Sequence, residues 1–556
     1  MNSWSEPSDT PGATGAPGAS PAPDAIDVLV VGAGPSGTAL AIDLVRRGLD
    51  IRIVDKAPQA FGGSRAKGVQ PRSLEILHDL GALDDVLAGG GAYPLLGFHL
   101  GPLTVPWRMF PRKRATPDVP HPNTWLIPQF RTDRALHTRL GAAHHGAEFG
   151  RELVGLTQDT ETARAEVAGP DGVEVITARY VVGADGGASQ VRKRLGIGFT
   201  GSTDEAERIL IVDAVVSGLS RDRWHMWPGR GGRLIGACPL PGGDLFQWII
   251  RLAPGEEPSL ERERIAERIH AHTRDRRIRL HDIRWTSVFR PNIRLAERYG
   301  QGRVLLAGDA AHVHTPAGAQ GLNTGIQDAY NLGWKLGQVL AGAGPRLLET
   351  YEAERRPIAA GVLGLSTEKW TGMSRLDPSS MKRGKDEQQL ALTYFGGPLA
   401  PADGERTRTL RVGDRAPDAE LLGPDGARTR LFDILRGPGF TAIGYGAGAA
   451  RALGQLDWPT AGAGLTKITI GEGGSAEGVG GSAAGGAGRD GGGAGRAAGS
   501  VERAFSDAGN TVRRAYGLTG DTLLLIRPDG YLGHIATRDF LATTEAAARA
   551  MTPAAS

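Results

Sequence analysis

One glycine-rich segment near the N-terminus has the spacing of a dinucleotide site. It reads VVGAGPSG, and its candidate residues are Gly32, Gly34, Pro35, Ser36 and Gly37. The three glycines would allow a tight turn, a close approach of the backbone to a pyrophosphate, and close packing of a helix on a strand. The N–H groups that open the helix would then bind the phosphates.

The residues that follow place this segment in a strand-turn-helix-strand unit. Residues 26–31 and 51–55 are apolar runs of strand length, and the intervening run has helical spacing. Asp55 and Lys56 end the second run, where a carboxylate can accept hydrogen bonds from an adenosine ribose. A glycine turn without this context occurs by chance, but here dinucleotide binding is the favoured interpretation.

Two later segments have the same kind of chemistry. GADGGASQVRKRLGI starts at Gly183, follows a strand-like run and contains Asp185. The third, GRVLLAGDAAHVHTPAGAQGLNTGIQDAYNLGWKL, places Gly308 and Asp309 at the end of a predicted strand and Gly321 at the start of a helix. A carboxylate at Asp309 could bind ribitol hydroxyls, and the free N–H groups of the helix would face the same place.

The elements that position these residues predict an α/β protein. Residues 200–290 alternate short β-like runs with one charged helix, which suggests a mostly antiparallel sheet. Helical spacing continues from Gly321 to Gly342. After about residue 400 the pattern restarts as a third, smaller α/β domain, in which residues 471–500 form a flexible glycine-rich insertion.

Composition narrows the class of protein. The chain has 556 residues, enough for about three domains, with 83 glycines and Cys238 as its single cysteine. An intramolecular disulfide and a cysteine-built metal site are therefore excluded. The formal net charge of +3 gives no reason to expect nucleic acid or a membrane surface as partner. Residues 1–24 read as a disordered tail rather than a secretory signal, and we expect a cytoplasmic protein.

In this order and spacing, the three segments resemble those of the class A flavoprotein monooxygenases, which have the para-hydroxybenzoate hydroxylase fold. The resemblance covers about residues 25–400, and YEAERRP, from Tyr351 to Pro357, matches the helix that closes this region in the family. The region from about 410 to 545 resembles the thioredoxin-like extension of the phenol and polyketide hydroxylase branch. Cys238 lies outside that extension, so thioredoxin redox chemistry is excluded there.

The resemblance implies a division into three folded domains. The fold is a Rossmann-like FAD-binding domain with a mostly antiparallel-sheet substrate domain and a C-terminal thioredoxin-like α/β domain. The expected boundaries are 25–95, 125–199 and 290–400 for the FAD-binding domain, 96–124 and 200–289 for the substrate-binding domain, and 401–556 for the thioredoxin-like domain.

The same resemblance places FAD on the chain. It implies the pyrophosphate at residues 32–37, the adenosine ribose at Asp55, and the ribitol and diphosphate near Asp309. Arg65 in GGSRAKGV and Gln129 in IPQ match flavin-contacting positions, and Asp185 belongs to a motif that serves both FAD and NAD(P)H. The alternatives are a surface arginine for Arg65 and an ordinary loop residue for Gln129.

The chemistry implied by the family starts with reduction of FAD by NAD(P)H. Oxygen then forms a flavin C4a-hydroperoxide, which an activated phenol-like ring attacks. We expect the backbone N–H groups of Leu322 and Asn323 to stabilise negative charge on the reduced flavin, and Pro316 to stiffen the loop beside C4a. No metal is expected, because the cofactor supplies the oxygen chemistry.

Aromatic residues in the second domain suggest a substrate pocket. His225 is the candidate base, although a structural strand histidine is the more common case. Trp224, Trp227, Phe246 and Trp248, together with Trp285, would suit a flat aromatic substrate, with no more than two of them expected in the pocket. Sheet core is the competing interpretation for the rest.

The predicted function is therefore NAD(P)H- and O2-dependent hydroxylation of a phenolic or polyketide-type aromatic. One alternative keeps the fold but catalyses Baeyer–Villiger oxidation, epoxidation or dehydrogenation. Another, from a different class, is a flavin-bound protein that sequesters a ligand without turnover. The expected partners are an aromatic small molecule and O2, with the chain as a monomer or homodimer.

Overall fold

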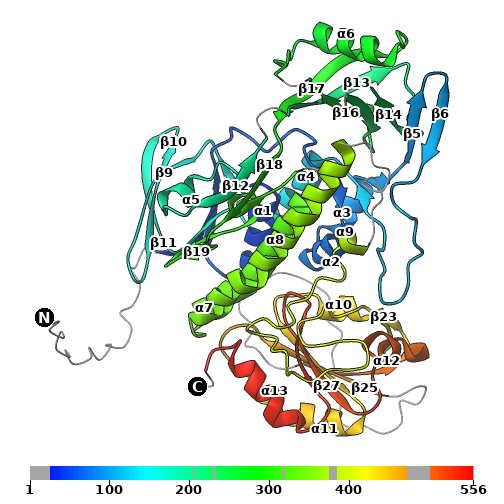
Figure 1. The fold of residues 1–556 in the computed structure, drawn as a ribbon. Coiled ribbons are helices and arrows are strands. Elements are labelled where there is room, and N and C mark those ends of the chain that lie inside the picture. The colour runs from blue at the N-terminus through cyan, green and yellow to red at the C-terminus, as the bar shows by residue number, and fades with distance from the viewer. Residues whose placement is uncertain are drawn as a thin grey trace, which may run out of the picture.

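The computed structural model describes residues 25–204, 207–229, 233–253, 255–315, 320–374, 385–471 and 501–554. The predicted tail 1–24, Pro316 and residues 472–500 of the predicted insertion lie outside these ranges. The described chain has a mixed α/β fold with three regions, each built on a large sheet (Figure 1). The first region begins with the strand β1, the second contains the helix α6, and the third contains the C-terminal elements.

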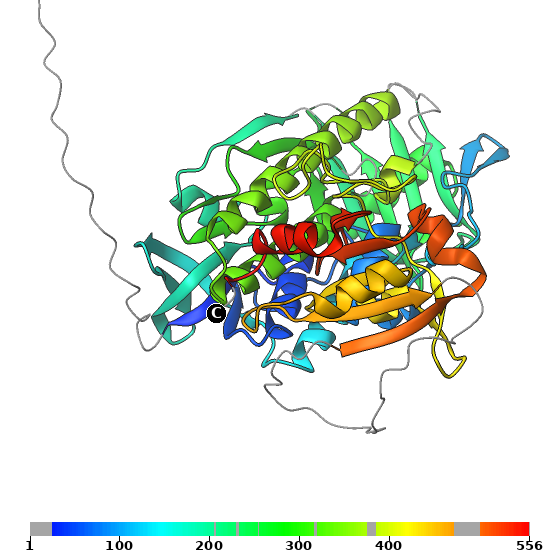
Figure 2. The same cartoon turned by 90° about the horizontal axis from the view of Figure 1, so that it is seen from below.

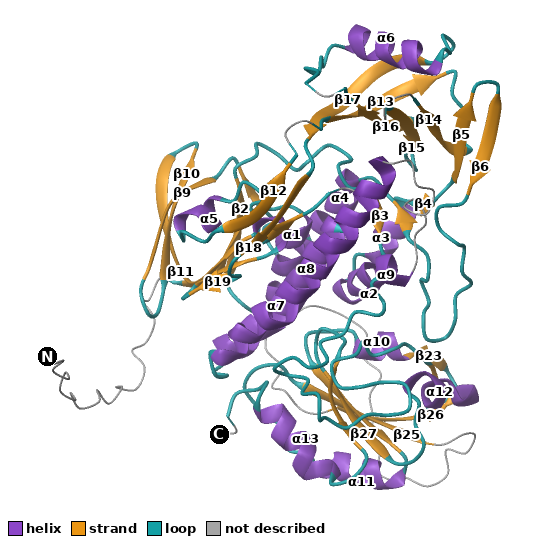
Figure 3. Cartoon of the chain, viewed as in Figure 1, coloured by secondary structure: helices purple, strands orange, loops and turns teal. Residues whose placement is uncertain are grey.

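The sheet of the first region has eight strands, in the order β19-β20-β11-β1-β2-β8, with β10 paired to β11 and β9 paired to β10. Figure 3 shows the strands of the molecule in orange and its helices in purple. The strands β20, β11, β1 and β2 run parallel and consist largely of buried apolar residues, as expected for strands covered on both faces. The bounds are β1 Ile26–Val31, β2 Ile51–Asp55, β8 Glu148–Phe149, β9 Glu152–Gln158, β10 Ala163–Gly169, β11 Gly172–Gly183, β19 Gly300–Gln301 and β20 Val304–Leu306.

Long helices cover this sheet. The predicted helix from Gly321 is confirmed as α7, Gly321–Leu340, which is buried along most of its length and packs on α1. Pro35 opens α1, where a residue without an N–H group breaks no hydrogen bond. The remaining helices of the region are α1 Pro35–Val45, α2 Pro71–Leu80, α3 Leu83–Ala88, α4 Gln129–Gly141, α5 Gln190–Arg194, α8 Arg346–Ser374 and α9 Lys385–Gln388.

The second region is a seven-stranded sheet in the order β17-β13-β16-β15-β14-β5-β6. Its pairs are antiparallel except for β14 with β5. Helix α6, Arg262–Thr273, covers the face that points away from the first region (Figure 1). The strands are β5 Leu95–Leu100, β6 Leu103–Trp107, β13 Ile209–Ser217, β14 Arg223–Pro228, β15 Leu234–Pro239, β16 Leu245–Arg251 and β17 Arg279–Phe289.

Two small sheets connect these regions. One contains β12 Phe199–Thr203, β18 Asn292–Ala296 and β21 His312–Val313, and the other contains β3 Gly68–Val69, β7 Trp125–Leu126 and β4 Gly91–Ala92. Their strands lie where the chain passes between the first and second regions, so the two large sheets are linked at several points.

The third region has its own seven-stranded mixed sheet, β23-β22-β26-β25-β24-β27-β28, with an apolar core on each face. Seen from below, it lies against the first region (Figure 2). Its elements are β22 Glu420–Leu422, β23 Arg428–Arg430, α10 Leu431–Leu435, β24 Phe440–Tyr445, α11 Ala447–Gln455, β25 Leu465–Gly471, β26 Val501–Asp507, α12 Thr511–Tyr516, β27 Thr522–Ile526, β28 Leu532–Ala536 and α13 Phe540–Arg549. Across the described parts of the chain, no helix combines the length and apolarity that crossing a bilayer requires.

Candidate functional site

The three glycine-containing segments meet at one edge of the first sheet. Because β1, β11 and β20 are parallel neighbours, their carboxyl ends lie side by side. Ala184 N donates to Val31 O at 2.7 Å, and Ala307 N donates to Gly183 O at 2.9 Å. Segments more than 100 residues apart in the sequence therefore form one continuous edge, the place where open α/β sheets bind ligands.

The glycines of the first segment are required for different reasons. Gly32 has φ +108°, and a Cβ there would lie 2.3 Å from Ala184 O. A Cβ on Gly37 would lie 1.9 Å from Gly32 O, so both positions are set by internal packing. A Cβ on Gly34 would meet no atom within 4 Å. Gly34 therefore leaves open space at the start of α1, where a pyrophosphate fits.

Ser36 links this segment to the third one. A Cβ on Gly308, whose φ is +61°, would lie 2.5 Å from Ser36 Oγ, and a Cβ on Gly325 would lie closer still. The N-terminus of α1, the turn Gly308–Ala310 and α7 therefore approach one another so closely that only glycine fits between them.

Asp55 lies at the end of β2 beside the glycine turn. Its Oδ2 accepts from Ala33 N at 2.8 Å, and its Oδ1 accepts from Ala57 N at 2.8 Å. A carboxylate has about four acceptor sites, so two remain for ribose hydroxyls. Lys56, the next residue, is exposed.

The two carboxylate oxygens of Asp185 have different environments. Its Oδ2 accepts from Gln190 N at 2.6 Å and from Val191 N at 3.2 Å, which caps the short helix α5. Its Oδ1 is buried and has no hydrogen-bond partner among the described residues. An unpaired buried oxygen at this edge fits a group that binds there.

Asp309 is exposed and lies near the start of α7. A Cβ on Gly321 would lie 3.9 Å from Asp309 Oδ1 and 3.2 Å from His314 Nε2. That histidine nitrogen is buried without a partner in the described chain, while His314 Nδ1 lies 2.8 Å from Thr315 O. Leu322, the second residue of α7, is partly buried.

Asn323 fixes the N-terminus of α7 to the segment that follows Arg65. Its Oδ1 accepts from Gln70 N at 2.8 Å, and its Nδ2 donates to Gly68 O at 2.8 Å. Arg65 itself is exposed, with its guanidinium carbon 5.7 Å from the centre of the Phe61 ring.

Gln129 holds the same segment from the other side. Its Oε1 accepts from Ala66 N at 3.2 Å, and its Nε2 donates to Asp133 Oδ2 at 3.4 Å. Burial raises the pKa of Asp133 to about 8. Gln129 at the start of α4 is thus hydrogen-bonded to the loop that carries Arg65, so the structure brings these two predicted flavin contacts together.

A buried ion cluster behind the third segment was not predicted. Asp328 Oδ2 lies 2.6 Å from His312 Nε2, and Asp328 Oδ1 accepts from Arg355 Nε at 2.7 Å. Burial alone would raise the pKa of Asp328, but His312 and Arg355 lower it. Asp328 Oδ2 also accepts from Gly308 N at 3.2 Å, so the cluster orients the turn that carries Asp309. Two sequence features could have pointed to this cluster: Asp328 is a carboxylate within the predicted helix from Gly321, and Arg355 belongs to the motif YEAERRP.

The expected base and three of the expected pocket residues lie in the core between the second sheet and α6. Trp227, Phe246 and Trp248 belong to the apolar core that this sheet forms with α6, and His225 is buried with its ring stacked on that of Trp227. His225 Nδ1 lies 2.8 Å from His99 Nε2, and its Nε2 lies 2.8 Å from Ser220 O, so both ring nitrogens have structural partners. The structure therefore favours the competing interpretations, sheet core for the three aromatic residues and a structural hydrogen-bonded role for His225, because strand alternation sends these side chains toward α6.

Trp224 and Trp285 do lie on the face toward the first region. The Trp224 ring centre is 4.2 Å from Lys67 Nζ. A Cβ on Gly63 would lie 2.3 Å from the Trp285 ring, so the loop that carries Arg65 passes directly over this indole.

A polar cluster that the sequence did not single out joins that loop to the sheet. Ser64 N donates to Asp213 Oδ2 at 2.8 Å, and Gln247 Nε2 donates to Ser64 Oγ at 2.6 Å. Lys67 Nζ donates to Gln247 Oε1. Burial raises the pKa of Asp213 to about 6. Asp213 and Gln247 alternate with the core residues of β13 and β16, which is the signal that could have located them.

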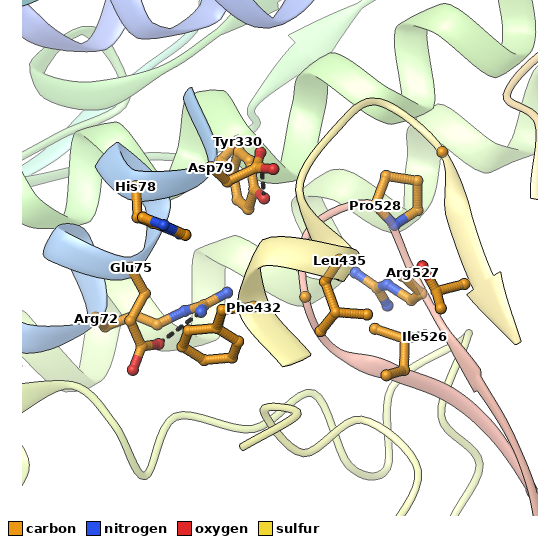
Figure 4. A pocket seen from close by; sticks show the side chains of 13 residues that line it. Arg72, Glu75, His78, Asp79, Tyr330, Phe432, Leu435, Ile526, Arg527 and Pro528 are labelled. Carbon is orange, nitrogen blue, oxygen red and sulfur yellow. Dashed lines mark hydrogen bonds and ion pairs between the residues drawn. The ribbon is translucent and has the colours of Figure 1, made fainter. Parts of the chain in front are cut away.

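A separate small cavity lies where α2 and α7 meet the third region (Figure 4). Its volume is about 30 Å³, and its wall includes Arg72, Glu75, Tyr330, Phe432 and Arg527. That space holds about one water molecule. The cavity is therefore part of a contact between regions and is too small for an aromatic substrate.

Comparisons with known proteins agree with this geometry. A family model described as FAD binding domain matches residues 25–366. A flavin-dependent monooxygenase of Mycobacteroides abscessus is 43% identical over 431 residues, which cover 76% of this chain and 89% of the relative. A Streptomyces rimosus protein named 12-dehydrotetracycline 5-monooxygenase/anhydrotetracycline 6-monooxygenase is 37% identical and covers 74% of this chain and 84% of its own.

Solved structures extend the likeness to almost the whole chain. OxyS anhydrotetracycline hydroxylase from Streptomyces rimosus superposes with a TM-score of 0.68 at 30% identity, over 95% of this chain and 100% of that one. The flavin-dependent monooxygenase PieE, in complex with FAD and substrate, gives a TM-score of 0.77 over 95% of this chain and 99% of that one, and its 23% identity limits that likeness to the fold.

The fold and the convergence of the three segments define a FAD-dependent monooxygenase of class A, as the sequence resemblance predicted. The chain belongs to the FAD binding domain family, whose model matches 25–366, and its relatives in that family are aromatic and polyketide monooxygenases. FAD is its cofactor, and NAD(P)H fits as the co-substrate.

Proposed function

We propose that this protein uses NAD(P)H and O2 to hydroxylate a phenolic or polyketide-type aromatic. One observation carries the proposal: the segment 63–68 contacts both the N-terminus of α7, through Gly68, and the inner face of the second sheet. Ser64 and Lys67 of that segment contact Asp213 and Gln247 of the sheet. A flavin on the edge and a ring against the sheet would then lie next to each other.

For FAD we propose the placement that the sequence suggested. The open space at Gly34 fits the pyrophosphate, Asp55 has acceptor sites left for the ribose, and Asp309 lies beside the start of α7 for the ribitol. The cofactor supplies the reduction and oxygen activation. The proposed contacting residues are Gly32, Gly34, Pro35, Ser36, Gly37, Asp55, Lys56, Arg65, Gln129, Asp185, Gly308, Asp309, Pro316, Gly321, Leu322 and Asn323.

The N-terminus of α7 is proposed to stabilise negative charge on the reduced ring system. A helix N-terminus near an anion contributes roughly 0.3 to 2 kcal/mol. Asn323 ties this end of α7 to Gly68, so the N–H groups are held in place before anything binds. Such preorganised donors cost no rearrangement during the reaction.

On the substrate side, we propose that the ring binds against the inner face of the second sheet. Trp224 and Trp285 supply aromatic surface there, and Asp213 and Gln247 supply polar contacts. The relatives named for anhydrotetracycline, rifampicin and pentachlorophenol suggest the substrates to try first.

The test is a substrate screen on the FAD-loaded protein. NADH or NADPH consumption is measured with and without anhydrotetracycline, rifampicin and pentachlorophenol, and products are examined by mass spectrometry and NMR. We expect one aromatic to accelerate consumption and to gain a ring hydroxyl. Loss of two hydrogens would indicate dehydrogenation, and NMR would separate Baeyer–Villiger and epoxide products. Stoichiometric binding without any accelerated consumption would instead support a sequestering protein.

The domain division is also proposed. We propose 25–95, 125–199 and 290–400 as the FAD-binding domain, 96–124 and 200–289 as the substrate-binding domain, and 401–556 as a thioredoxin-like domain without thioredoxin chemistry. Sheet membership supports this, because β5 and β6 join the strands of residues 209–289, and the mixed sheet of the third region has helices on both faces. We further propose a cytoplasmic monomer or homodimer.

A further inference from the structure

Lys67 is a buried lysine between two regions of the molecule. Its side chain lies under the inner face of the second sheet, where the ammonium group donates to Gln247 Oε1 and lies 4.2 Å from the centre of the Trp224 ring. Both partners are neutral. The lysine backbone is fixed as well, because Tyr93 Oη donates to Lys67 O at 3.1 Å.

No carboxylate of the described chain forms an ion pair with this ammonium group. Asp213 is the nearest candidate, but its oxygens accept from Ser64 N at 2.8 Å and from Ser64 Oγ. The other titratable group facing Lys67 is the thiol of Cys238 on β15, whose pKa burial raises to about 11. A buried ammonium group that lacks a counter-charge is costly, so burial favours the neutral amine of Lys67 until an anion lies beside it.

Trp224 adds a second unused donor at the same place. Its indole Nε1 is buried and has no acceptor among the residues that the structure describes. An ammonium group has three N–H donors, and Gln247 accepts one of them. Once Lys67 is protonated, the contact between the loop 63–67 and the second sheet therefore presents N–H donors without matching acceptors, and these are complementary to an anionic oxygen.

The position of Lys67 relates this donor set to the chemistry. Gly68, the next residue, accepts from Asn323 at the N-terminus of α7, where we place the reactive end of the flavin. Lys67 therefore lies between the proposed oxygen-transfer site and the sheet that would hold the ring. An ionised phenol or enol makes an aromatic ring more electron-rich and more reactive toward an electrophilic oxygen.

We propose that Lys67 binds the ionised oxygen of a phenol or enol on the substrate and so selects acidic phenols and enolised polyketides. The proposal rests on the monooxygenase function above. When the substrate binds as a neutral phenol, its O–H bond breaks, a new N–H bond forms on the lysine amine, and an ammonium–phenolate pair remains. No further reactant is needed.

The electrostatics support this proton transfer. Burial lowers the pKa of Lys67, so the amine of the free protein gives up its proton more readily than an exposed lysine does. An anionic oxygen beside it would favour the ammonium form again. Because Lys67 is buried, the attraction between its ammonium group and the ionised oxygen would be stronger than in water.

The experiment compares binding of three probes to FAD-loaded wild type, Lys67→Met and Lys67→Arg. The probes are anhydrotetracycline, pentachlorophenol and 4-nitrophenol, whose absorption spectra differ between neutral and ionised forms. We expect wild type to bind at least one probe in its ionised form. Lys67→Met should bind it about tenfold or more weakly and in its neutral form, whereas Lys67→Arg should keep the ionised spectrum.

Lys467→Met is the matched control, because Lys467 is also buried and donates to Leu456 O at 2.7 Å in the third region. It should leave probe affinity unchanged. FAD content and the melting temperature identify any variant that fails to fold. Equal affinity and an ionised probe in folded Lys67→Met would overturn the inference while leaving the proposed function standing. Failure of wild type to bind any probe or to consume NAD(P)H would count against both.

Discussion

Gly34 and Gly37 are three residues apart in one turn, yet a side chain would have opposite consequences at the two positions. At Gly37 a Cβ would lie 1.9 Å from Gly32 O, inside the protein. At Gly34 it would enter open space outside the turn. Gly37 is therefore required for folding, whereas the role proposed for Gly34 is to leave space for the ligand, although the motif presents the two glycines as equivalent.

This contrast predicts different phenotypes for two alanine variants. Gly34→Ala should fold with a melting temperature near that of the wild-type apoprotein but should retain less than about a tenth of its FAD, because the methyl group occupies the proposed phosphate space. Gly37→Ala should lower the melting temperature of the apoprotein, because helix and strand must separate. Calorimetry and flavin absorbance measure the two effects. A Gly34→Ala protein with full FAD content would contradict the placement.

Asp133 offers a second prediction, on pH dependence. Its pKa of about 8 lies above the value near 3.9 of an unfolded aspartate. The folded state therefore holds this proton more tightly, and the stabilisation is complete below about pH 4 and is lost as the pH rises through about 8. Asp133→Asn stays neutral and should melt about 5 °C higher than wild type near pH 9 but at a similar temperature near pH 4.

Asp171→Asn is the matched control for that comparison, because Asp171 is exposed in a turn. Thermal melts of the apoproteins across the pH range give the answer. A constant difference between wild type and Asp133→Asn at every pH would show that Asp133 is ionised throughout or acts only through packing.

At the scale of the element, strand alternation determines which aromatic side chains can face the proposed substrate. The run Trp224-His225-Met226-Trp227 lies on β14, and its side chains alternate between two faces. Trp224 points to the first region and Trp227 into the core under α6. Composition alone located an aromatic cluster, but the assignment of faces required the position of α6 and of the first region.

Strand alternation yields a prediction that separates these two tryptophans. Trp224→Ala should raise the KM for the aromatic substrate about tenfold with little loss of stability, because it removes surface on the proposed substrate side. Trp227→Ala should destabilise the protein by about 3 to 5 kcal/mol, as expected for a large aromatic removed from a core, with KM unchanged. Steady-state kinetics and chemical denaturation distinguish the two. The inner-face assignment fails if Trp227→Ala changes KM and Trp224→Ala does not.

Local signals account for much of the first region. The glycine spacing, the apolar strand runs and the helix from Gly321 are encoded within short windows, and the structure has them. The pairing of Ser64 with Asp213 joins residues 149 positions apart, and strand alternation can mark Asp213 as a polar residue in a core strand but cannot identify its partner. The same holds for Lys67 and Gln247. Contacts that depend on how two sheets are placed were therefore beyond the reach of sequence patterns.

At the scale of the whole molecule, neighbouring residues of one motif connect the site to the third region. In YEAERRP on α8, Arg355 pairs with Asp328, which also binds the turn Gly308–Ala310, while Glu354 pairs with Arg527 of the third region. Arg527 Nη1 donates to Glu354 Oε1 at 2.7 Å, and Lys335 Nζ donates to Glu354 Oε2 at 2.8 Å. All of these groups are buried. The third region is thus fixed to α8, the helix that carries Arg355, through Glu354, which also binds Lys335 of α7.

Removing the Arg527 side chain should therefore weaken both the contact between the third region and α8 and the proposed FAD site. Burial alone would raise the pKa of Glu354, but Arg527 and Lys335 lower it to about 2. The stabilisation is present above about pH 4.5, the ordinary glutamate value, and is lost as the pH falls toward 2. Arg527→Met leaves a buried carboxylate short of a partner, which costs about 3 to 5 kcal/mol at neutral pH.

Limited proteolysis, melting temperature and FAD content near pH 7 measure that effect. We expect faster cleavage between the first and third regions, a lower melting temperature and weaker FAD retention in Arg527→Met. Arg549→Met, which removes an exposed arginine from α13, should behave as wild type. Because Glu354 loses its charge at low pH, the difference between Arg527→Met and wild type should shrink as the pH falls below about 4. If Arg527→Met matched wild type near pH 7, the other contacts of the third region, such as the ion pair between Arg415 and Glu75, would be sufficient to hold it, and the pairing of Glu354 with Arg527 would have no part in supporting the proposed FAD site.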